Sequence, residues 1–471
     1  ADKNIELSTL AERVRPLDWG AHLPTQFDAV LGNPPYLKEA GHRVVFEDLK
    51  ASRSSSYYSA KMDLWYAFSC QAVDLLRPGG RHGFIVQNNW GTAQSARSLR
   101  SKFRRETRLI ECFDFHDLQV FERAGIQTMI YVLVKEEVTR PYSMTYSRVV
   151  TQDASPNRLQ RVLHTPHPKD VHTHLCEIDP RAGGAILTFV SRETQLILAH
   201  LQAQAAFNIH RHEVGQGIIG GPDKAFLFPV DGSFTPDESR LLFPHYTNAQ
   251  PFDVGDSDRL IAYLTPETLN QLDPNRFPHF SEQLSRFRER LENRRETKSG
   301  RIKWFHLHWP RRSDLFEPGP KLVCPTRVSQ PSFAYTEKAF YASRAINMVV
   351  CHRIDLRFLA GVLNSSLIHY WLVNQGKRLG RMLQIDTAFL LDIPIARATH
   401  STTQGIENTI IQVVDELERW LEQHPESRGT QMHTDKVRAA KNTLDPLVYR
   451  LYQMSAKQIR AIQFALSPEQ N

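Results

Sequence analysis

The chain has 471 residues, which predicts two or three domains, and its 41% hydrophobic and 23% charged content is that of an ordinary soluble globular protein. No apolar run reaches the length of a membrane span and no signal peptide opens the chain, which argues against a membrane protein. The five cysteines are scattered without paired spacing, which argues against a disulfide framework and for a reducing compartment. The net charge of +7 permits a polyanionic partner.

The first informative stretch is Arg13–Trp19, which we predict as a short strand that ends in an acid and an aromatic residue, Asp18 and Trp19. A second interpretation is an aspartate that caps a helix beside a core tryptophan. The residues alone leave both open.

Residues 27–31 predict a short buried strand, because they are mostly apolar and are closed by Gly32. Asn33-Pro34-Pro35-Tyr36 follows. Two prolines remove two backbone donors and fix two φ angles, so we expect a stiff loop. It lies at the carboxyl end of a strand, where open α/β sheets bind their ligands. A proline-rich turn without a further role is the alternative.

This loop suits one kind of chemistry. An exocyclic amine on an aromatic ring is a poor nucleophile, because its lone pair is delocalised into the ring. The side-chain oxygen of Asn33 and the carbonyl of Pro34 can accept its two hydrogens and favour a pyramidal nitrogen. Tyr36 offers a flat face on which a base can stack, so this chemistry requires neither a metal nor a covalent nucleophile.

Asn-Pro-Pro-Tyr after an apolar strand resembles motif IV of the amino-methyltransferases that use S-adenosylmethionine. The longer context resembles the gamma-class DNA adenine methyltransferases of the TaqI-like and type IIG restriction–modification kind. The resemblance implies S-adenosylmethionine as cofactor and catalytic roles for Asn33, Pro34, Pro35 and Tyr36. It also implies that Asp18 accepts from the cofactor's adenine amine and that Trp19 packs on its ring.

Residues 63–76 have helical spacing, and we expect Pro78-Gly79-Gly80 to end this helix before a buried strand over 83–86. The unit resembles motifs V and VI of the same family. Phe68 matches a family position near the cofactor, although an aromatic residue on a helix face is more often part of a core.

Another strand is predicted over 109–113, and 120–134 resembles motif VIII of the family. In that motif an aromatic residue stacks on the flipped target base, and Phe121 matches it. Stacking between Tyr36 and Phe121 would compensate the base for its lost duplex neighbours. The alternative is a core or loop phenylalanine.

Residues 137–185 form a junction that contains a group of histidines, but no cysteine pair supports zinc and we predict no metal site. A helix over about 186–206 should lead to the next domain. The glycine-rich stretch 215–226 fits neither the dinucleotide nor the P-loop spacing. Instead, short segments from Gly215 to Ile395 resemble, in order, the target-recognition domain of TaqI-like enzymes.

Ten lysines and arginines stand between 286 and 312 against three acids, with Trp304 and Trp309 among them, and a second basic loop begins at Lys377. Such spacing suits contacts to DNA phosphates and base edges, although most charge runs are solvated helix faces. The predicted DNA-binding residues are Arg286, Arg288, Arg290, Arg294, Arg295, Lys303, Arg311, Arg312, Lys377, Arg378 and Arg381.

The predicted fold class is α/β: a Rossmann-like methyltransferase sheet that lacks its N-terminal strands, then an α+β target-recognition domain and C-terminal helices. The expected divisions are catalytic residues 1–150, a linker and bridging helix over 151–207, a recognition domain over 208–399 and helices over 400–471.

The family also carries a glycine-rich cofactor loop, and only 17 residues precede Asp18. We therefore expect an upstream segment, trimmed or on another chain, to complete the cofactor pocket. No nuclease signature stands out, so cleavage would need a partner.

The sequence predicts a site-specific DNA adenine methyltransferase that acts on a flipped adenine in duplex DNA, in a bacterial or archaeal cytoplasm, as part of restriction–modification or another anti-phage system. Two alternatives remain. One is a methyltransferase that acts on RNA or on protein amides. The other is a DNA-binding specificity component without activity of its own.

Overall fold

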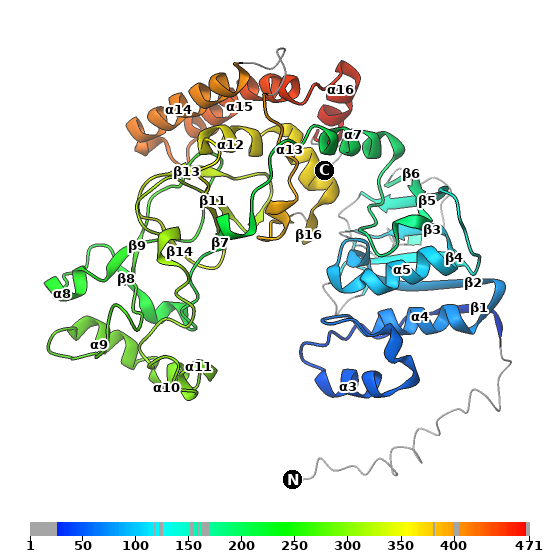
Figure 1. The fold of residues 1–471 in the computed structure, drawn as a ribbon, viewed down its shortest axis with the longest axis horizontal. Helices are drawn as coiled ribbons and strands as arrows, with labels where there is room; N and C mark the ends of the chain where they lie inside the picture. The colour runs from blue at the N-terminus through cyan, green and yellow to red at the C-terminus, as the bar shows by residue number, and fades with distance from the viewer. Residues whose placement is uncertain are drawn as a thin grey trace, which may run out of the picture. The chain divides into compact units, whose positions relative to one another are not determined.

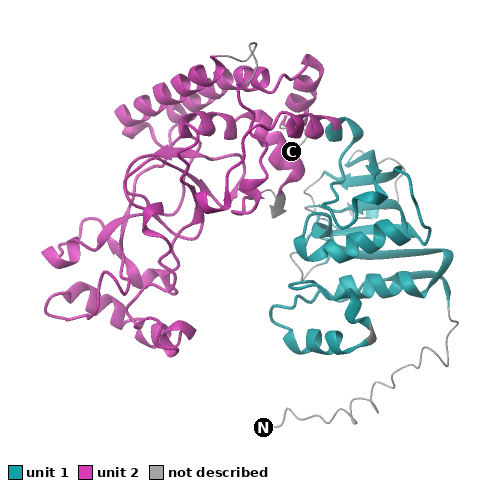
Figure 2. Ribbon diagram, in the orientation of Figure 1, with its two compact units in different colours: residues 1–195 teal, residues 196–471 magenta. Residues whose placement is uncertain are grey.

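The computed structural model describes residues 26–116, 118–121, 126–150, 155, 157, 160–162, 170–379, 382–398 and 405–467. The chain divides into two compact units, Ala1–Gln195 and Leu196–Asn471, coloured separately in Figure 2. Within the described ranges, no helix is both long and apolar enough to cross a membrane.

Unit 1 is built on a six-stranded sheet with the order β1-β2-β4-β3-β5-β6. Its strands are β1 (Phe27–Gly32), β2 (Leu76–Gln87), β3 (Arg108–Asp114), β4 (Thr128–Val134), β5 (Tyr142–Val149) and β6 (Val171–Ile178). β1 pairs with β2 in parallel, and β4 runs antiparallel between β2 and β3. The sheet is therefore mixed rather than purely parallel.

Helix α4 (Trp65–Leu75) connects β1 to β2 and α5 (Arg97–Glu106) connects β2 to β3, as Figure 1 shows. The buried face of α4 contributes Trp65 and Val73 to a core that also holds Phe84 and Tyr131 from the sheet. Helix α3 (Arg43–Ala51) precedes α4, and α7 (Arg192–Ala203) spans the boundary between the units.

Two local predictions are wrong. The strand predicted over 27–31 is present as β1, but it is not buried, because it is an edge strand of the described sheet and Leu31 is 77% exposed. Pro78-Gly79-Gly80 does not end α4; the helix stops at Leu75, and these residues lie inside β2. The pairing of β1 with β2 shifts register there, and Gly79 has φ = 76°. A bulge needs such a backbone, which glycine adopts without a Cβ clash. The glycines were correctly predicted to interrupt a regular element, but they form a bulge in a strand and not the end of a helix.

The strand directions gather three chain segments at one edge of the sheet. Gly32 at the end of β1 pairs beside Phe84 near the end of β2, and Gln87 pairs with Thr128 at the start of β4. Asp114 at the end of β3 pairs with Met129. The loop after β1 and the loop between β3 and β4 therefore leave the sheet at the same edge, although they are far apart in sequence.

Unit 2 contains three small sheets, with strand orders β14-β9-β10-β8, β13-β11-β15-β7 and β12-β17-β16. The strands are β7 (Val214–Gln216), β8 (Leu227–Pro229), β9 (Leu242–Tyr246), β10 (Arg259–Ala262), β11 (Lys321–Pro325), β12 (Arg327–Val328), β13 (Ala334–Thr336), β14 (Tyr341–Ala342), β15 (Ile346–Val349), β16 (Lys377–Leu379) and β17 (Met382–Gln384). The first two sheets share a core of buried aromatic and aliphatic side chains.

The helices of unit 2 fall into two groups. Short helices α8 (Pro236–Ser239), α9 (Pro278–Ser285), α10 (Arg288–Glu292) and α11 (Arg295–Lys298) lie at the end of the unit opposite the C-terminal helices (Figure 1). The longer helices are α12 (Leu356–Leu363), α13 (Ser366–Gln375), α14 (Ile406–Gln423), α15 (Gln431–Leu451) and α16 (Ala456–Ala465). The structure is thus of mixed α/β class, as predicted, with helices at its C-terminus.

Helices α12 and α14 pack closely because of one glycine. A Cβ on Gly361 of α12 would lie 2.5 Å from a side-chain carbon of Ile410 on α14. Ile410 and Val414 are fully buried in this contact. The helices predicted over 400–471 thus include α14, whose buried side chains form one apolar face.

Candidate functional site

The loop of residues 33–36 follows β1 directly. Pro34 is buried, whereas Asn33 and Pro35 are exposed. The buried proline ring anchors the loop, and its missing N–H leaves no donor to satisfy. The Asn33 side chain is thereby free to meet a ligand at the edge of the sheet.

The Tyr36 side chain is held by its hydroxyl group. Its hydroxyl donates to the carbonyl oxygen of Ile85 on β2 at 2.8 Å. Burial, and then the charge of Asp63, raise the pKa of Tyr36 to about 12. The phenol therefore remains a neutral donor at physiological pH, and the ring is held in one position beside the loop.

Phe121 lies next to this ring. It is half-buried in the loop between β3 and β4, and the two ring centroids are 6.5 Å apart at an angle of 64°. The carbonyl of Phe121 accepts a hydrogen bond from the Gln119 side chain at 2.9 Å. The structure thus brings together the two aromatic residues that the sequence selected for base stacking.

Asp63 is the first residue of the segment predicted as a helix over 63–76, and its surroundings are unusual. Its side chain is 3% exposed, and within the described residues no hydrogen bond of ordinary geometry reaches either carboxylate oxygen. Burial raises its pKa, while nearby N–H groups of Trp65 and Leu37 act in the opposite direction. Since Leu64 N–H also donates to Leu37 O at 2.8 Å, this buried acid sits where α4 fastens the end of the Asn33–Tyr36 loop.

The predicted cofactor residues are only partly visible. Asp18 and Trp19 lie outside the described residues. Phe68 is 44% exposed, although its neighbours Tyr66, Ala67, Ser69 and Cys70 on α4 are buried. An exposed aromatic ring on an otherwise buried helix segment is available for stacking.

Four of the eight arginines of the basic run are exposed and paired with a nearby acid. Arg286 pairs with Glu282. The other pairs are Arg288 with Glu292 at 2.8 Å, Arg295 with Glu296 at 3.2 Å and Arg312 with Asp314 at 2.9 Å. Such surface pairs contribute little to stability and exchange readily for other anions.

Arg294 is different. Its side chain is buried at 8% exposure and donates to the carbonyl oxygens of Leu291, Gly220 and Trp304 at 2.9 to 3.0 Å. This guanidinium holds the fold together, so we leave it out of the proposed DNA-contacting set. Its spacing in sequence does not differ from that of its exposed neighbours, and only the packing against Gly220 separates them.

The remaining predicted cations are distributed as follows. Lys303 donates to the carbonyl oxygen of Asn270, and Arg311 to that of Gly217 at 3.3 Å. Lys377 and Arg378 lie on β16, and Arg381 lies outside the described residues. Arg290 is exposed, as are Lys298 and Arg301, which the DNA-binding set did not include; in the described parts of the chain none of the three side chains has a hydrogen bond or ion pair.

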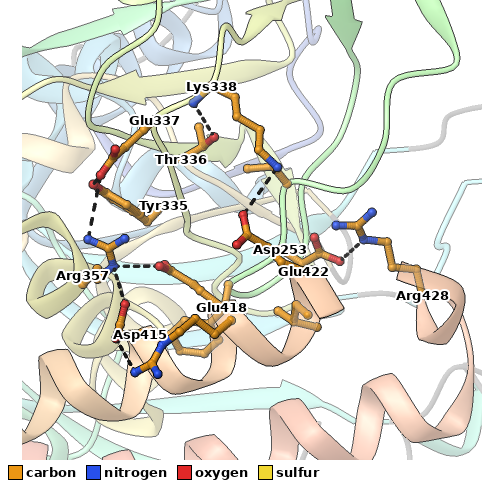
Figure 3. A pocket seen from close by; sticks show the side chains of 14 residues that line it. Asp253, Tyr335, Thr336, Glu337, Lys338, Arg357, Asp415, Glu418, Glu422 and Arg428 are labelled. Atoms are coloured by element: carbon orange, nitrogen blue, oxygen red, sulfur yellow. Dashed lines mark hydrogen bonds and ion pairs between the residues drawn. The ribbon is translucent and has the colours of Figure 1, made fainter. Parts of the chain in front are cut away.

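A charged pocket in unit 2 is lined by side chains from β13, α12 and α14 (Figure 3). Arg357 lies 2.8 Å from Glu418 and 3.7 Å from Asp415, and Arg428 lies 3.0 Å from Asp253. Burial raises the pKa of Glu418 to about 7, although Arg357 opposes this. The charges neutralise one another, so we interpret this pocket as a brace for the C-terminal helices.

The histidines of the junction form no group that can be assessed as a whole, because His164 and His167 lie outside the described residues and His172 and His174 stand on β6. His210, His212 and Glu213 come close enough to share an ion. The Glu213 carboxylate, however, accepts from Arg353 at 2.6 Å and from the His210 N–H at 2.7 Å. We assign no metal to them.

A segment of each unit matches a family of known proteins. Residues 2–121 match the Eco57I restriction-modification methylase family, and residues 281–395 match the TaqI-like C-terminal specificity domain. The chain therefore carries a segment that matches an Eco57I-type methylase and a segment that matches a TaqI-like specificity domain. This confirms the resemblance drawn from the Asn33–Tyr36 loop and from the segments after Gly215, and it identifies a methylase-like sheet, a specificity domain and C-terminal helices.

Two curated relatives of the Eco57I/TaqI-like chain are type II methyltransferases. M.BstVI from Geobacillus stearothermophilus is 22% identical over 94% of this chain and 76% of its own length. M.PaeR7I from Pseudomonas aeruginosa is 24% identical over 80% of this chain and 66% of its own length. The chain therefore spans two thirds to three quarters of these relatives.

A solved structure shares the fold. The type IIL restriction-modification enzyme MmeI, solved in complex with DNA, matches 95% of this chain with a TM-score of 0.61 and 13% sequence identity. This chain covers 58% of the MmeI chain.

Proposed function

We propose that this Eco57I/TaqI-like chain transfers a methyl group to the exocyclic amine of an adenine in duplex DNA. The observation that supports it most is the Asn33–Tyr36 loop at the edge of the sheet, with the Tyr36 and Phe121 rings side by side. The loop supplies fixed acceptors and the rings supply a stacking surface. These are the two needs of an amine on an aromatic base.

Asn33 and Pro34 do the chemical work in this proposal. The exposed Asn33 oxygen and the Pro34 carbonyl accept the two amine hydrogens, which directs the nitrogen lone pair out of the ring plane. Both acceptors belong to a stiff loop, so little reorganisation is needed as charge develops. The amine proton leaves after the new bond has formed.

Tyr36 and Phe121 hold the base outside the helix. A flipped adenine loses its stacking neighbours, and aromatic side chains return about 1–3 kcal/mol per base. Because the Tyr36 hydroxyl is engaged by Ile85, its ring cannot rotate away from this position. The edge-on arrangement of the two rings leaves the base to contact one by its face and the other by its edge.

S-adenosylmethionine is the methyl donor that the family implies, and it would supply an electrophilic methyl group. The exposed Phe68 ring suits stacking on its adenine, and we propose Asp18 and Trp19 as further contacts. An upstream segment or partner chain that completes this pocket remains part of the proposal.

Duplex DNA is the proposed partner of the specificity domain, and MmeI, which shares the fold, was solved with DNA. Arg286, Arg288, Arg290, Arg295, Lys303, Arg311, Arg312, Lys377, Arg378 and Arg381 are the proposed contacts. Phosphate contacts of this kind give a salt-dependent affinity. The first domain extends beyond the predicted division at 150, because β6 (Val171–Ile178) pairs with β5 in the sheet of unit 1. We retain the divisions at 207 and 399 as proposals, together with a restriction–modification setting with or without a nuclease partner.

The test is a labelled-methyl transfer assay with duplex DNA, RNA and protein as acceptors, run on the chain together with any upstream segment encoded with it. We expect label on adenine in duplex DNA alone. Label on RNA or protein would support the rival methyltransferase. Isothermal titration with S-adenosylmethionine separates the last alternative, because a silent specificity component would bind DNA and produce no heat with the cofactor.

A further inference from the structure

Among the tryptophans of the described residues, only Trp309 is exposed, with 41% of its surface open to solvent. Trp65, Trp90 and Trp371 are buried, and Trp304 is half-buried beneath the Arg288 guanidinium, 4.8 Å from its ring. Single exposed apolar side chains are ordinary, and Phe68 and Phe464 are exposed as well. The backbone and the charges around Trp309 are what set it apart.

The backbone under Trp309 is held rigidly. Trp309 exchanges two hydrogen bonds with Ile219, at 2.9 and 3.1 Å, and the Tyr263 hydroxyl donates to Pro310 O at 3.2 Å. Arg311 has φ = 69°, a left-handed conformation that a non-glycine residue adopts at a cost. Residues 309–311, which we call the Trp309 tip, therefore form a strained but fixed segment rather than a flexible loop.

The glycine-rich stretch supports this tip. A Cβ on Gly217 would lie 2.0 Å from the carbonyl oxygen of Ser343, so only glycine allows this approach. Ile218 N–H donates to Ala342 O at 2.7 Å, and Arg311 donates to Gly217 O at 3.3 Å. The glycines, which fit no nucleotide motif, therefore serve as a base on which residues 309–311 rest.

Two exposed cations lie on and just after α11, the helix that His308 contacts. His308, next to Trp309, makes a 2.6 Å contact with Glu296 on α11, which ties this helix to the tip. Lys298 at the end of α11 and Arg301 just after it are exposed, and no ion pair or side-chain hydrogen bond holds either within the described ranges. The segment of Trp309 and α11 are thus joined by the His308–Glu296 contact, and an exposed ring with exposed cations on joined segments suits a polyanion with an apolar interior.

We propose that Trp309 contacts the bases of the target duplex and contributes to sequence discrimination, while Lys298 and Arg301 contact the adjacent phosphates. This rests on the proposed DNA methyltransferase function and names a residue of its recognition surface. An indole can contact a thymine methyl group or a base step in a groove without a hydrogen bond. Because the backbone is already fixed, little conformational entropy is lost when the ring meets DNA.

The experiment selects from a pool of short duplexes with a randomised centre, using the wild type, Trp309→Ala, Trp309→Phe and Phe464→Ala. Phe464 on α16 is 65% exposed and serves as the matched aromatic control. We expect the wild type and Phe464→Ala to enrich one motif. For Trp309→Ala we expect about a tenfold loss in the ratio of motif to pool affinity, with the salt dependence of pool binding unchanged.

The outcomes separate this inference from the proposed function. Enrichment by the wild type with equal enrichment by Trp309→Ala would overturn the role of Trp309 and leave the function intact. Failure of the wild type to enrich any motif would overturn both. Partial recovery by Trp309→Phe, with unchanged unfolding temperatures, would support an apolar ring contact rather than a folding defect.

Discussion

At the residue scale, the candidate site is defined by which side chains of the Asn33–Tyr36 loop are held by the protein and which are exposed. The Tyr36 hydroxyl is committed to Ile85, and Pro34 is buried. Asn33 remains exposed. The chemistry of an aromatic amine suggested the roles of Asn33, Pro34 and Tyr36, whereas Phe121 was predicted from its resemblance to motif VIII of the family. Neither could predict Asp63, whose burial depends on how the start of α4 packs against Leu37.

Tyr36 gives a prediction that separates ring from hydroxyl. Tyr36→Phe removes the hydrogen bond to Ile85 and should lower the free energy of unfolding by about 1 kcal/mol, with methyl transfer within a few-fold of wild type. Tyr36→Ala removes the stacking surface and should reduce kcat/KM about a hundredfold. Urea unfolding and methyl-transfer kinetics measure both. Equal loss of activity in the two variants would mean that the hydroxyl, not the ring, is required.

At the element scale, sequence periodicity located most elements and missed the details that packing decides. Residues 63–76 and 406–421 correspond to α4 and α14, whereas Pro78–Gly80 became a bulge because β2 begins at once after α4. Burial of Arg294 was likewise invisible, since its carbonyl partners come from Gly220 and Trp304 as well as its own turn. Charge spacing alone cannot separate a structural guanidinium from one that meets DNA.

The contact of α12 with α14 should respond to pH through Glu418. Its pKa is raised from 4.5 to about 7, so between these values the folded state holds a proton that the unfolded state has lost. The contribution of Glu418 to the free energy of unfolding is therefore most favourable below about pH 4.5. It falls by about 3 kcal/mol as the pH rises from there through 7. Glu418→Gln should lack this loss and be the more stable protein at pH 8.

Urea unfolding at pH 6 and pH 8 measures this effect. Glu416→Gln, at an exposed glutamate of the same helix that does not line the pocket, is the matched control and should behave as wild type. A Glu418→Gln protein that is less stable than wild type at pH 8 would show instead that the ion pair with Arg357 outweighs the burial of the charge.

At the scale of the whole molecule, two kinds of structure divide the work. A mixed sheet presents the Asn33–Tyr36 loop at one edge, and a separate unit of small sheets carries the specificity domain. The order of these parts could be predicted, because each segment resembles its counterpart in the same sequence order. The rigidity of the Trp309 tip could not, since it depends on contacts between Ile219, Ser343 and residues 309–311.

The most direct test of the central claim is the methylation of duplex DNA by Asn33→Ala, with Asn442→Ala as a control at an exposed asparagine of α15. N6-methyladenine in the product DNA and duplex affinity are measured in parallel. We predict that Asn33→Ala abolishes methylation and binds DNA as wild type does, whereas Asn442→Ala changes neither. Methylation retained by Asn33→Ala would contradict the role of the loop.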